Sequence, residues 1–243
     1  MTAFTGSGMV LNKRRKMEKM ELTNILKLHA RWLDGENDGV KANLQGINLQ
    51  GINLHGTNLR GANLQRANLQ KTSLEGADLR GADLLRADLI RADLRGADLR
   101  WADLRKADLP SADLRDANLR GANLEKANLY EANLQGANLE KANLYEANLQ
   151  GANLEKANLQ GANLEKANLY EANLDYACWP LWCGSKNVKV DVNIARQLAA
   201  HFCALDCPDL DYQKAKEVIL SFATLSHRAV ELGLSMPSGC SPR

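Results

Sequence analysis

The sequence predicts an all-β solenoid, in which one backbone conformation recurs every five residues. Leucine stands at every fifth position from Leu44 to Leu174, and these 27 leucines follow one another without an insertion or a deletion. A period of five fits neither the 3.6-residue helix nor the two-residue strand, and it also excludes the heptad of a coiled coil. The internal period therefore decides the fold before local propensities are considered.

The residues before each leucine follow a second rule. Alanine stands two positions earlier and Asn or Asp one position earlier, and the two positions after the leucine vary. The departures from this rule are Ile47, Ile52, Thr57, Thr72 and Ser73. We expect the alanine and the leucine to point inward and the variable pair to form a turn. A chain that turns at every fifth residue becomes a stack of coils whose backbones pair with one another.

The repeat A(D/N)LXX resembles the signature of the pentapeptide repeat family, and the likeness covers more than half of the chain. The resemblance implies a right-handed quadrilateral β-helix with four pentapeptides in each coil. About seven coils are then expected, over a length of about 30 Å if each coil rises about 4.8 Å. The flanking phrases ILKLHARWL and CWPLWCGS are similar to flanks of bacterial and phage members of the family, although they are less specific than the repeats.

The flanks of the repeats predict helices. Leu22, Ile25, Leu26, His29 and Leu33 have helical spacing, and Asp34-Gly35 follows them as a stop signal. We interpret this helix as a cap over the first coil, with Trp32 or Leu33 against the first leucines and His29 as ordinary packing. The predicted segments are a flexible basic segment 1–16, a capping helix and turn 17–39, the β-helix 40–179, a C-terminal helical hairpin or cap 180–236 and a tail 237–243.

Composition limits the class of partner and the compartment. The formal net charge is +2, which is too small to argue for direct nucleic-acid or membrane binding. The chain has no apolar run near the roughly 20 residues that span a bilayer, and its first residues lack the apolar core of a signal peptide. All five cysteines lie in the last third and none staples the repeats, which is typical of a reducing cytoplasm.

The predicted interior restricts the function. Leucine and alanine fill the coils, so the repeats offer no concave site with converging polar groups. We therefore interpret the chain as a non-enzymatic interaction or scaffold protein without a cofactor, which acts through its outer faces and its C-terminal hairpin.

Residues 20 positions apart stack on one face if each coil holds four repeats. One face then carries a column of four arginines, and the neighbouring face carries two more. These partner-surface candidates are Arg60, Arg80, Arg100 and Arg120, with Arg95 and Arg115. The column could bind phosphate or a carboxylate-rich partner. The alternative, which the composition favours, is that nearby aspartates such as Asp78 and Asp98 neutralise it.

A second column contains apolar residues. Ile90, Pro110 and Tyr130 lie in it, and Trp101 protrudes elsewhere. A contiguous apolar strip can mark an interaction surface. The near-identical copies of EKANLYEANLQGANL that contain the tyrosines favour recent duplication over selection of each residue.

The resemblance also implies an alternative function. Members of the family inhibit or protect DNA gyrase and are thought to resemble duplex DNA in shape and negative charge. Duplex DNA carries one charge per roughly 1.7 Å of axis. In this chain the basic and acidic residues of the repeats nearly cancel, so charge does not support a DNA surrogate, and DNA gyrase remains the alternative partner.

Two hypotheses attach to the C-terminal region. The first is a cap that also forms a homodimer through an apolar helix surface, with Trp179, Trp182, Phe202 and Phe222 as candidates. The second, a low-ranked alternative, is a metal site. Its candidate ligands are Cys178, Cys183, His201, Cys203 and Cys207, whose spacing permits zinc.

Overall fold

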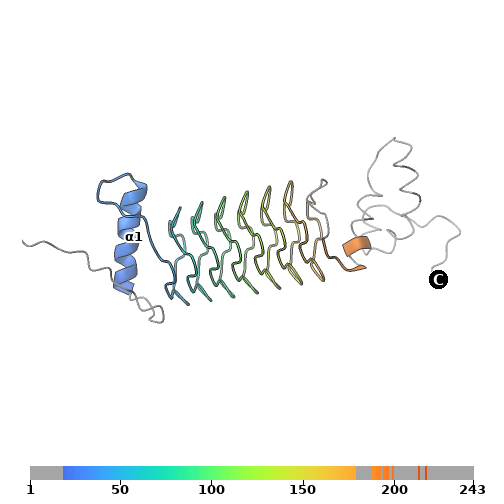
Figure 1. Cartoon of the computed structure of the whole chain (residues 1–243), viewed down its shortest axis with the longest axis horizontal. Coiled ribbons are helices and arrows are strands. Elements are labelled where there is room, and N and C mark those ends of the chain that lie inside the picture. Colours follow the sequence, from blue (N-terminus) through green and yellow to red (C-terminus); the bar gives the residue numbers. More distant parts are fainter. Residues whose placement is uncertain are drawn as a thin grey trace, which may run out of the picture.

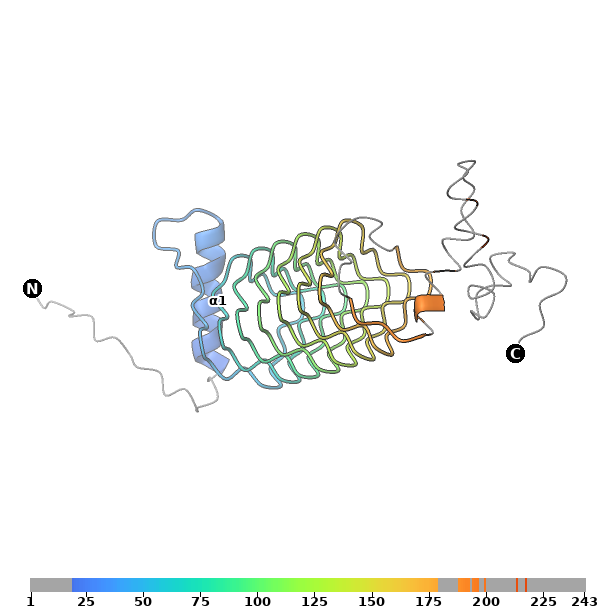
Figure 2. The same ribbon diagram turned by 45° about the vertical axis from the view of Figure 1, so that its right-hand side comes forward.

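The computed structural model describes residues 19–178, 188–192, 194–196, 199, 213 and 217. A helix, α1 (Lys19–Leu33), stands at one end of a stack of coils (Figure 1). Seen from a second direction, the coils are open squares that follow one another along a single axis (Figure 2). No helix among the described residues is both long and apolar enough to cross a membrane.

Successive coils pair through single-residue parallel bridges rather than through named strands. Each bridge joins residues 20 positions apart, as between Asn43 and Asn63, from the first coil to Asn153 and Asn173. One coil is therefore four pentapeptides. We name the four faces by their first leucine: face 1 begins with Leu44, face 2 with Leu49, face 3 with Leu54 and face 4 with Leu59, and each continues at every twentieth residue.

The backbone hydrogen bonds explain why the period is five. In the first repeat the N–H of Leu44 donates to the carbonyl of Asn63 in the next coil, at 2.7 Å, and the N–H of Ile47 donates back to Leu44 to close a turn. The second residue after every leucine, from Gly46 to Tyr176, has a φ between 53° and 69°. A turn with a positive φ at that position is of type II, which favours glycine there. Each corner of the square is such a turn.

The core matches the predicted inward pair. The leucines and alanines of the repeats are almost completely buried, with leucines from Leu59 to Leu119 at 0% exposure. The departure at Thr72 is accommodated because its buried hydroxyl donates to the carbonyl of Leu49 at 2.9 Å. The alanine and leucine positions of each repeat therefore point into the core, and only the other three positions present side chains on the outer surface.

Helix α1 covers the first coil with its apolar side. Leu22 is buried, and Ile25 and Leu26 pack partly buried against the core. The helix ends in a Schellman motif, in which Glu36 N–H donates to Arg31 and Gly35 has a φ of 77°. The chain then passes so close to the helix that a Cβ on Gly39 would lie 2.2 Å from the backbone nitrogen of Trp32. Trp32 itself is 39% exposed.

The pairing continues beyond the last residue of the leucine series. Asn168 on face 2 bridges to Lys189, and Val188 and Val190 on either side of Lys189 pack partly buried against the core. The residues described after this point at 192, 194–196 and 199 are helical, and the Asp191 carboxylate accepts the N–H of Ile194 as a helix N-cap. Of the rest of the predicted C-terminal hairpin, only residues 213 and 217 are described.

Candidate functional site: the outer faces of the solenoid

The described solenoid presents its polar groups outward. One open hollow of about 330 Å³ lies on face 3 and is lined by Glu75, Arg95, Gly96, Arg115 and Asp116. Within the described residues no group of three or more His, Cys, Asp or Glu side chains is placed to hold a metal ion. The columns of outer side chains are the candidate functional surface of the described part.

The Asn or Asp of each repeat is part of the backbone structure. Its Oδ1 accepts the N–H of the residue two positions later, as Asn43 does from Gln45 at 3.3 Å. This bond recurs in every repeat from Asn43 to Asn173 except at Ser73 and at Asp108, where Pro110 has no N–H to donate. Where Asn stacks on Asn, the amides in most pairs also bond between coils, as Asn63 does to Asn43.

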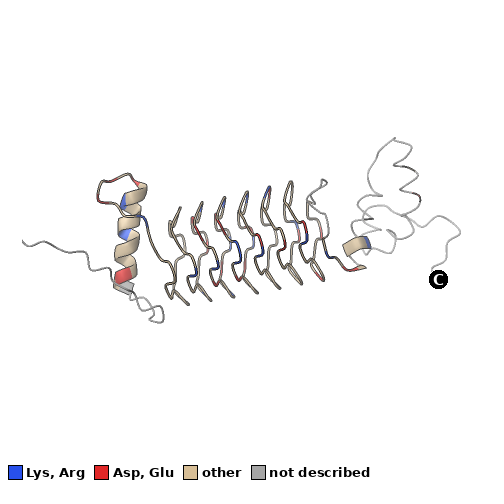
Figure 3. Cartoon of the chain, in the orientation of Figure 1, with Lys and Arg blue, Asp and Glu red and all other residues tan. Residues whose placement is uncertain are grey.

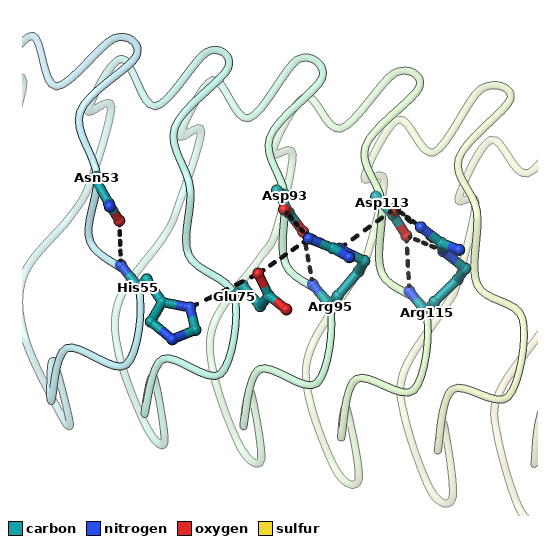
Figure 4. A network of polar contacts seen from close by, with 7 residues as sticks. All are labelled: Asn53, His55, Glu75, Asp93, Arg95, Asp113 and Arg115. Atoms are coloured by element: carbon teal, nitrogen blue, oxygen red, sulfur yellow. Dashed lines mark hydrogen bonds and ion pairs between the residues drawn. The ribbon is translucent and has the colours of Figure 1, made fainter.

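Face 3 carries a polar network that runs across several coils (Figure 4). The guanidinium of Arg95 binds Asp93 of its own repeat at 2.8 Å and Glu75 of the preceding coil at 3.0 Å. Glu75 also lies 3.7 Å from the imidazole of His55. The hydrogen bond from Arg95 lowers the pKa of Asp93, and the same contact raises the pKa of Arg95. Arg115 is held in the same way by Asp113.

The arginine column of face 4 is stacked as the 20-residue spacing predicts. Arg80 and Arg100 each bind the aspartate of their own repeat through two nitrogens, at Asp78 and Asp98. The Nε of Arg120 lies 3.4 Å from Glu140 in the next coil. Arg60 has no ion pair with a described carboxylate. Three of the four charges in this column are thus neutralised within the molecule. Along the coils as a whole, basic and acidic segments are interspersed (Figure 3).

The apolar candidates lie on two different parts of the surface. Ile90, Pro110 and Tyr130 follow one another on face 2, where Tyr130 is 39% exposed. Trp101 is 62% exposed at the corner after face 4, where its ring covers Gly121 and lies 5.7 Å from the Arg100 guanidinium. The structure therefore does not bring Trp101 into the strip on face 2.

Five exposed cations at the corners of face 2 were not singled out from the sequence. Arg66, Arg86 and Lys106 immediately precede successive repeats of this face, and Lys71 and Arg91 immediately follow two of them. None of the five forms an ion pair or a side-chain hydrogen bond with a described residue. The signal that could have found them is the 20-residue spacing, applied to the second residue after each leucine.

The C-terminal candidates fall largely outside the described residues. This holds for the dimer or cap candidates Trp179, Trp182, Phe202 and Phe222 and for the metal candidates Cys183, His201, Cys203 and Cys207. The remaining metal candidate, Cys178, is an exposed free thiol that bridges Asn158 in the place of a repeat Asn.

One family model matches the chain. It is described as pentapeptide repeats and matches eight copies over residues 40–76, 72–109, 111–145 and 147–178, which together exceed half of the chain. Among curated proteins, no sequence matches.

Solved structures of repeat proteins are also similar. HetL, a pentapeptide repeat protein involved in heterocyst differentiation regulation in the cyanobacterium Nostoc sp. strain PCC 7120, is 30% identical, and the match covers 71% of this chain and 94% of HetL with a TM-score of 0.32. QnrB1, a plasmid-mediated fluoroquinolone resistance protein, is 19% identical, covering 68% of this chain and 97% of QnrB1 with a TM-score of 0.32. A pentapeptide repeat protein of the Arabidopsis thaliana thylakoid lumen is 28% identical, covering 51% and 70% with a TM-score of 0.27.

Proposed function

Because the chain belongs to the pentapeptide repeat family, which folds as a right-handed quadrilateral β-helix, we propose that it is a non-enzymatic interaction or scaffold protein. It binds another macromolecule through its outer faces. The proposal includes a rod of about seven coils in the cytoplasm and a C-terminal helical hairpin over residues 180–236 that caps the rod and contributes a dimer contact.

The observation that carries the proposal is the division between a closed interior and an ordered exterior. Leucines such as Leu84 and Leu104 are 0% exposed, so the described coils have no room for a substrate. The outer side chains, by contrast, form columns in which equivalent positions recur at every coil. A rigid surface of this kind suits recognition of an extended partner, because its side chains are positioned before binding.

Charge separates this proposal from a DNA surrogate that acts on a topoisomerase. A surrogate needs a negative surface that matches the dense charge of a duplex. In this chain four aspartates of faces 3 and 4 are bound by arginines, and face 2 is bordered by unpaired cations; the four are Asp78, Asp93, Asp98 and Asp113. We therefore propose a protein partner that is recognised without imitation of DNA, and DNA gyrase is the alternative partner. A supercoiling assay in which micromolar protein alters gyrase activity would favour the surrogate instead.

The test is capture of partners by the full chain, compared across four single-face variants. The variants are Arg105→Glu on face 1, Tyr130→Glu on face 2, Arg115→Glu on face 3 and Arg120→Glu on face 4. We expect a partner from native host extract that is retained by three variants and lost by the variant on the contact face. Equal retention by all four variants, or no protein above the level of an unrelated bait, would overturn the proposal.

A further inference from the structure

We propose that face 2 binds an acidic amphipathic helix of a partner protein, which lies along the solenoid axis between two rows of cations. This inference rests on the function proposed above and adds the face and the chemistry of the partner. The first rim is Arg66, Arg86 and Lys106, at the corner that precedes face 2. The second rim is Lys71 and Arg91, at the corner that follows it.

The rim cations are available to a partner because no acidic residue stands next to them in the chain. At equivalent corners, Lys126, Lys141 and Lys156 pair with the glutamate directly before them. Where an aspartate stands directly before the leucine, an arginine directly after the leucine binds it, as Arg105 binds Asp103. A rim residue stands one position later, so the residue two positions before it is the buried leucine itself, as Leu84 is for Arg86. All five rim residues are exposed, with φ between 55° and 57°. Like charges stacked one coil apart repel one another, and an anion that binds them relieves this repulsion.

The spacing along each rim is close to the pitch of an α-helix. Successive coils place one cation about every 4.8 Å, and a helix presents one stripe of its surface every 5.4 Å. Glu or Asp at every third or fourth position of a helix therefore aligns with Arg66, Arg86 and Lys106 to within about 1 Å over the two intervals. Flexible Arg and Lys side chains accommodate this difference. The two rims stand five residues apart, which spans at most about 17 Å, so no more than one helix about 10–12 Å across lies between them.

The floor between the rims favours a helix over a nucleic acid. One row holds Ile90, Pro110 and Tyr130 in three successive coils, which suits the apolar stripe of an amphipathic helix. The other row holds Asp88, whose carboxylate accepts the Gln70 amide at 2.6 Å, and the exposed Asp108. The continuous charge of a phosphate backbone would meet these carboxylates, whereas a helix can place uncharged or basic residues over them.

The probe is a pair of synthetic peptides about 20 residues long, enough for a helix of about 30 Å. Both contain the same Ala, Leu and Glu residues. One has its glutamates and leucines in two separate stripes, and the other has them spread over all sides of the helix. Binding to the full chain is measured by fluorescence anisotropy, alongside a fluorescent duplex and a fluorescent single-stranded oligonucleotide.

The variant is Arg86→Glu with Arg91→Glu, and the matched control is Lys141→Glu with Lys156→Glu. The control residues are also exposed corner cations with a φ of 58° and 59°, but they lie after faces 4 and 3 and are paired with Glu140 and Glu155. If the charge reversal lowers the thermal midpoint, the milder variant Arg86→Gln with Arg91→Gln replaces it in the binding measurement. We expect the striped peptide to bind, with an affinity that falls as salt is added. The rim variant should weaken it by about tenfold or more, and the control variant should leave it unchanged.

Three outcomes would overturn the inference. They are failure of the striped peptide to bind, equal binding of the spread peptide, and tighter binding of either oligonucleotide. Failure here together with partner capture that depends on face 1, 3 or 4 would leave the proposed function standing. If partner capture were unchanged by the variants on all four faces, both the proposed function and this inference would be overturned.

Discussion

The Nδ1 of His29 in α1 accepts a hydrogen bond of 3.1 Å from the backbone N–H of Ala42, the first inward alanine of the solenoid. In later repeats the corresponding N–H donates to the leucine of the preceding repeat, as Ala62 does to Leu59. Ala42 has no such leucine before it, because position 39 is Gly39. The imidazole therefore takes the place of the missing leucine carbonyl as the acceptor for the Ala42 N–H at the end of the solenoid.

Replacing His29 should destabilise the protein. His29→Leu keeps an apolar side chain at a position that is 0% exposed but leaves the Ala42 N–H buried without an acceptor. We expect a loss of about 1–3 kcal/mol in the free energy of unfolding. His29→Gln, which offers an oxygen acceptor, should recover part of this loss. Urea titrations of the three proteins measure it, and equal midpoints and slopes for His29→Leu and the parent would refute the role of the bond.

The same contact predicts a pH dependence. Burial lowers the pKa of His29 below its ordinary value of 6.5, and the neighbouring Lys41 charge lowers the pKa further. The unfolded chain therefore takes up the proton first as the pH falls. The stability from neutral His29 is complete above about pH 6.5 and is lost as the pH falls through the folded-state pKa.

Urea titrations between about pH 8 and pH 5 test this window. We expect the free energy of unfolding of the parent to fall over it more than that of His29→Gln does. Parallel curves for the two proteins would show that the titration of another group is responsible.

The positive φ at each corner predicts that replacing a corner glycine with alanine reduces stability. Gly96 has a φ of 61° and no atom within 4 Å of the place where a Cβ would lie, so Gly96→Ala changes the backbone preference without a clash. We expect it to reduce stability by about 1 kcal/mol. Lys141→Ala is the control, because Lys141 already adopts a φ of 58° without being glycine. Its stability should stay within about 0.5 kcal/mol of the parent. Equal effects of the two substitutions in thermal unfolding would contradict the argument.

These contacts also show how far the sequence predicts the molecule. The unbroken series from Leu44 to Leu174 is enough for the coil, because each inward leucine repeats one local conformation. The positive φ at each corner was harder to predict. Lys and Glu occupy this position in some repeats and glycine in others, so the residue types do not indicate one shared conformation. The pairing of Lys189 with Asn168 was not predicted. Val188–Val190 points inward, outward and inward as Ala-Asn-Leu does, but it contains none of these three residue types.

The surface was predicted less completely than the core. The arginine column followed from the spacing of the first residue after each leucine, but its ion pairs depend on Asp78 and Asp98 two positions earlier. The rim residues of face 2 occupy the second position after a leucine. In the sequence, Arg66 and Arg86 are separated by glycines that occupy the same position on other faces, so the column is not apparent. The role of His29 could not be inferred at all, because it depends on the helix and Ala42 meeting in space.

The paired aspartates predict loss of stability in acid. Hydrogen bonds from the following arginine lower the pKa of four carboxyl groups below their ordinary value of 3.8, and these belong to Asp78, Asp93, Asp103 and Asp113. Because each folded-state pKa is the lower one, this stability is present above about pH 4 and is lost as the pH falls through the folded-state values.

Asp103→Asn isolates one of these groups. It keeps an oxygen for the Arg105 N–H, which bonds to Asp103 at 3.1 Å, but removes the charge. We expect a change of less than about 1 kcal/mol at pH 7, since the pair lies at the surface. The variant should then lose less stability than the parent between about pH 4 and pH 2. Circular dichroism during acid titration measures both, and a steeper acid transition in Asp103→Asn would be incompatible with the ion pair.

A charge inside the rod should be far more damaging than a charge on it. Leu104 is 0% exposed, and the side chains that fill the interior around it are leucines and alanines. Leu104→Lys therefore buries an ammonium without a partner and also loses the packing of the leucine. We expect a loss of about 4 kcal/mol or more, and a fall of about 10 °C in the thermal midpoint. Trp101→Lys is the control, because Trp101 is 62% exposed three residues earlier in the same coil. Soluble Leu104→Lys protein with the midpoint of the parent would mean that the interior admits water, and the inference that this protein acts only through its surface would then lose its foundation.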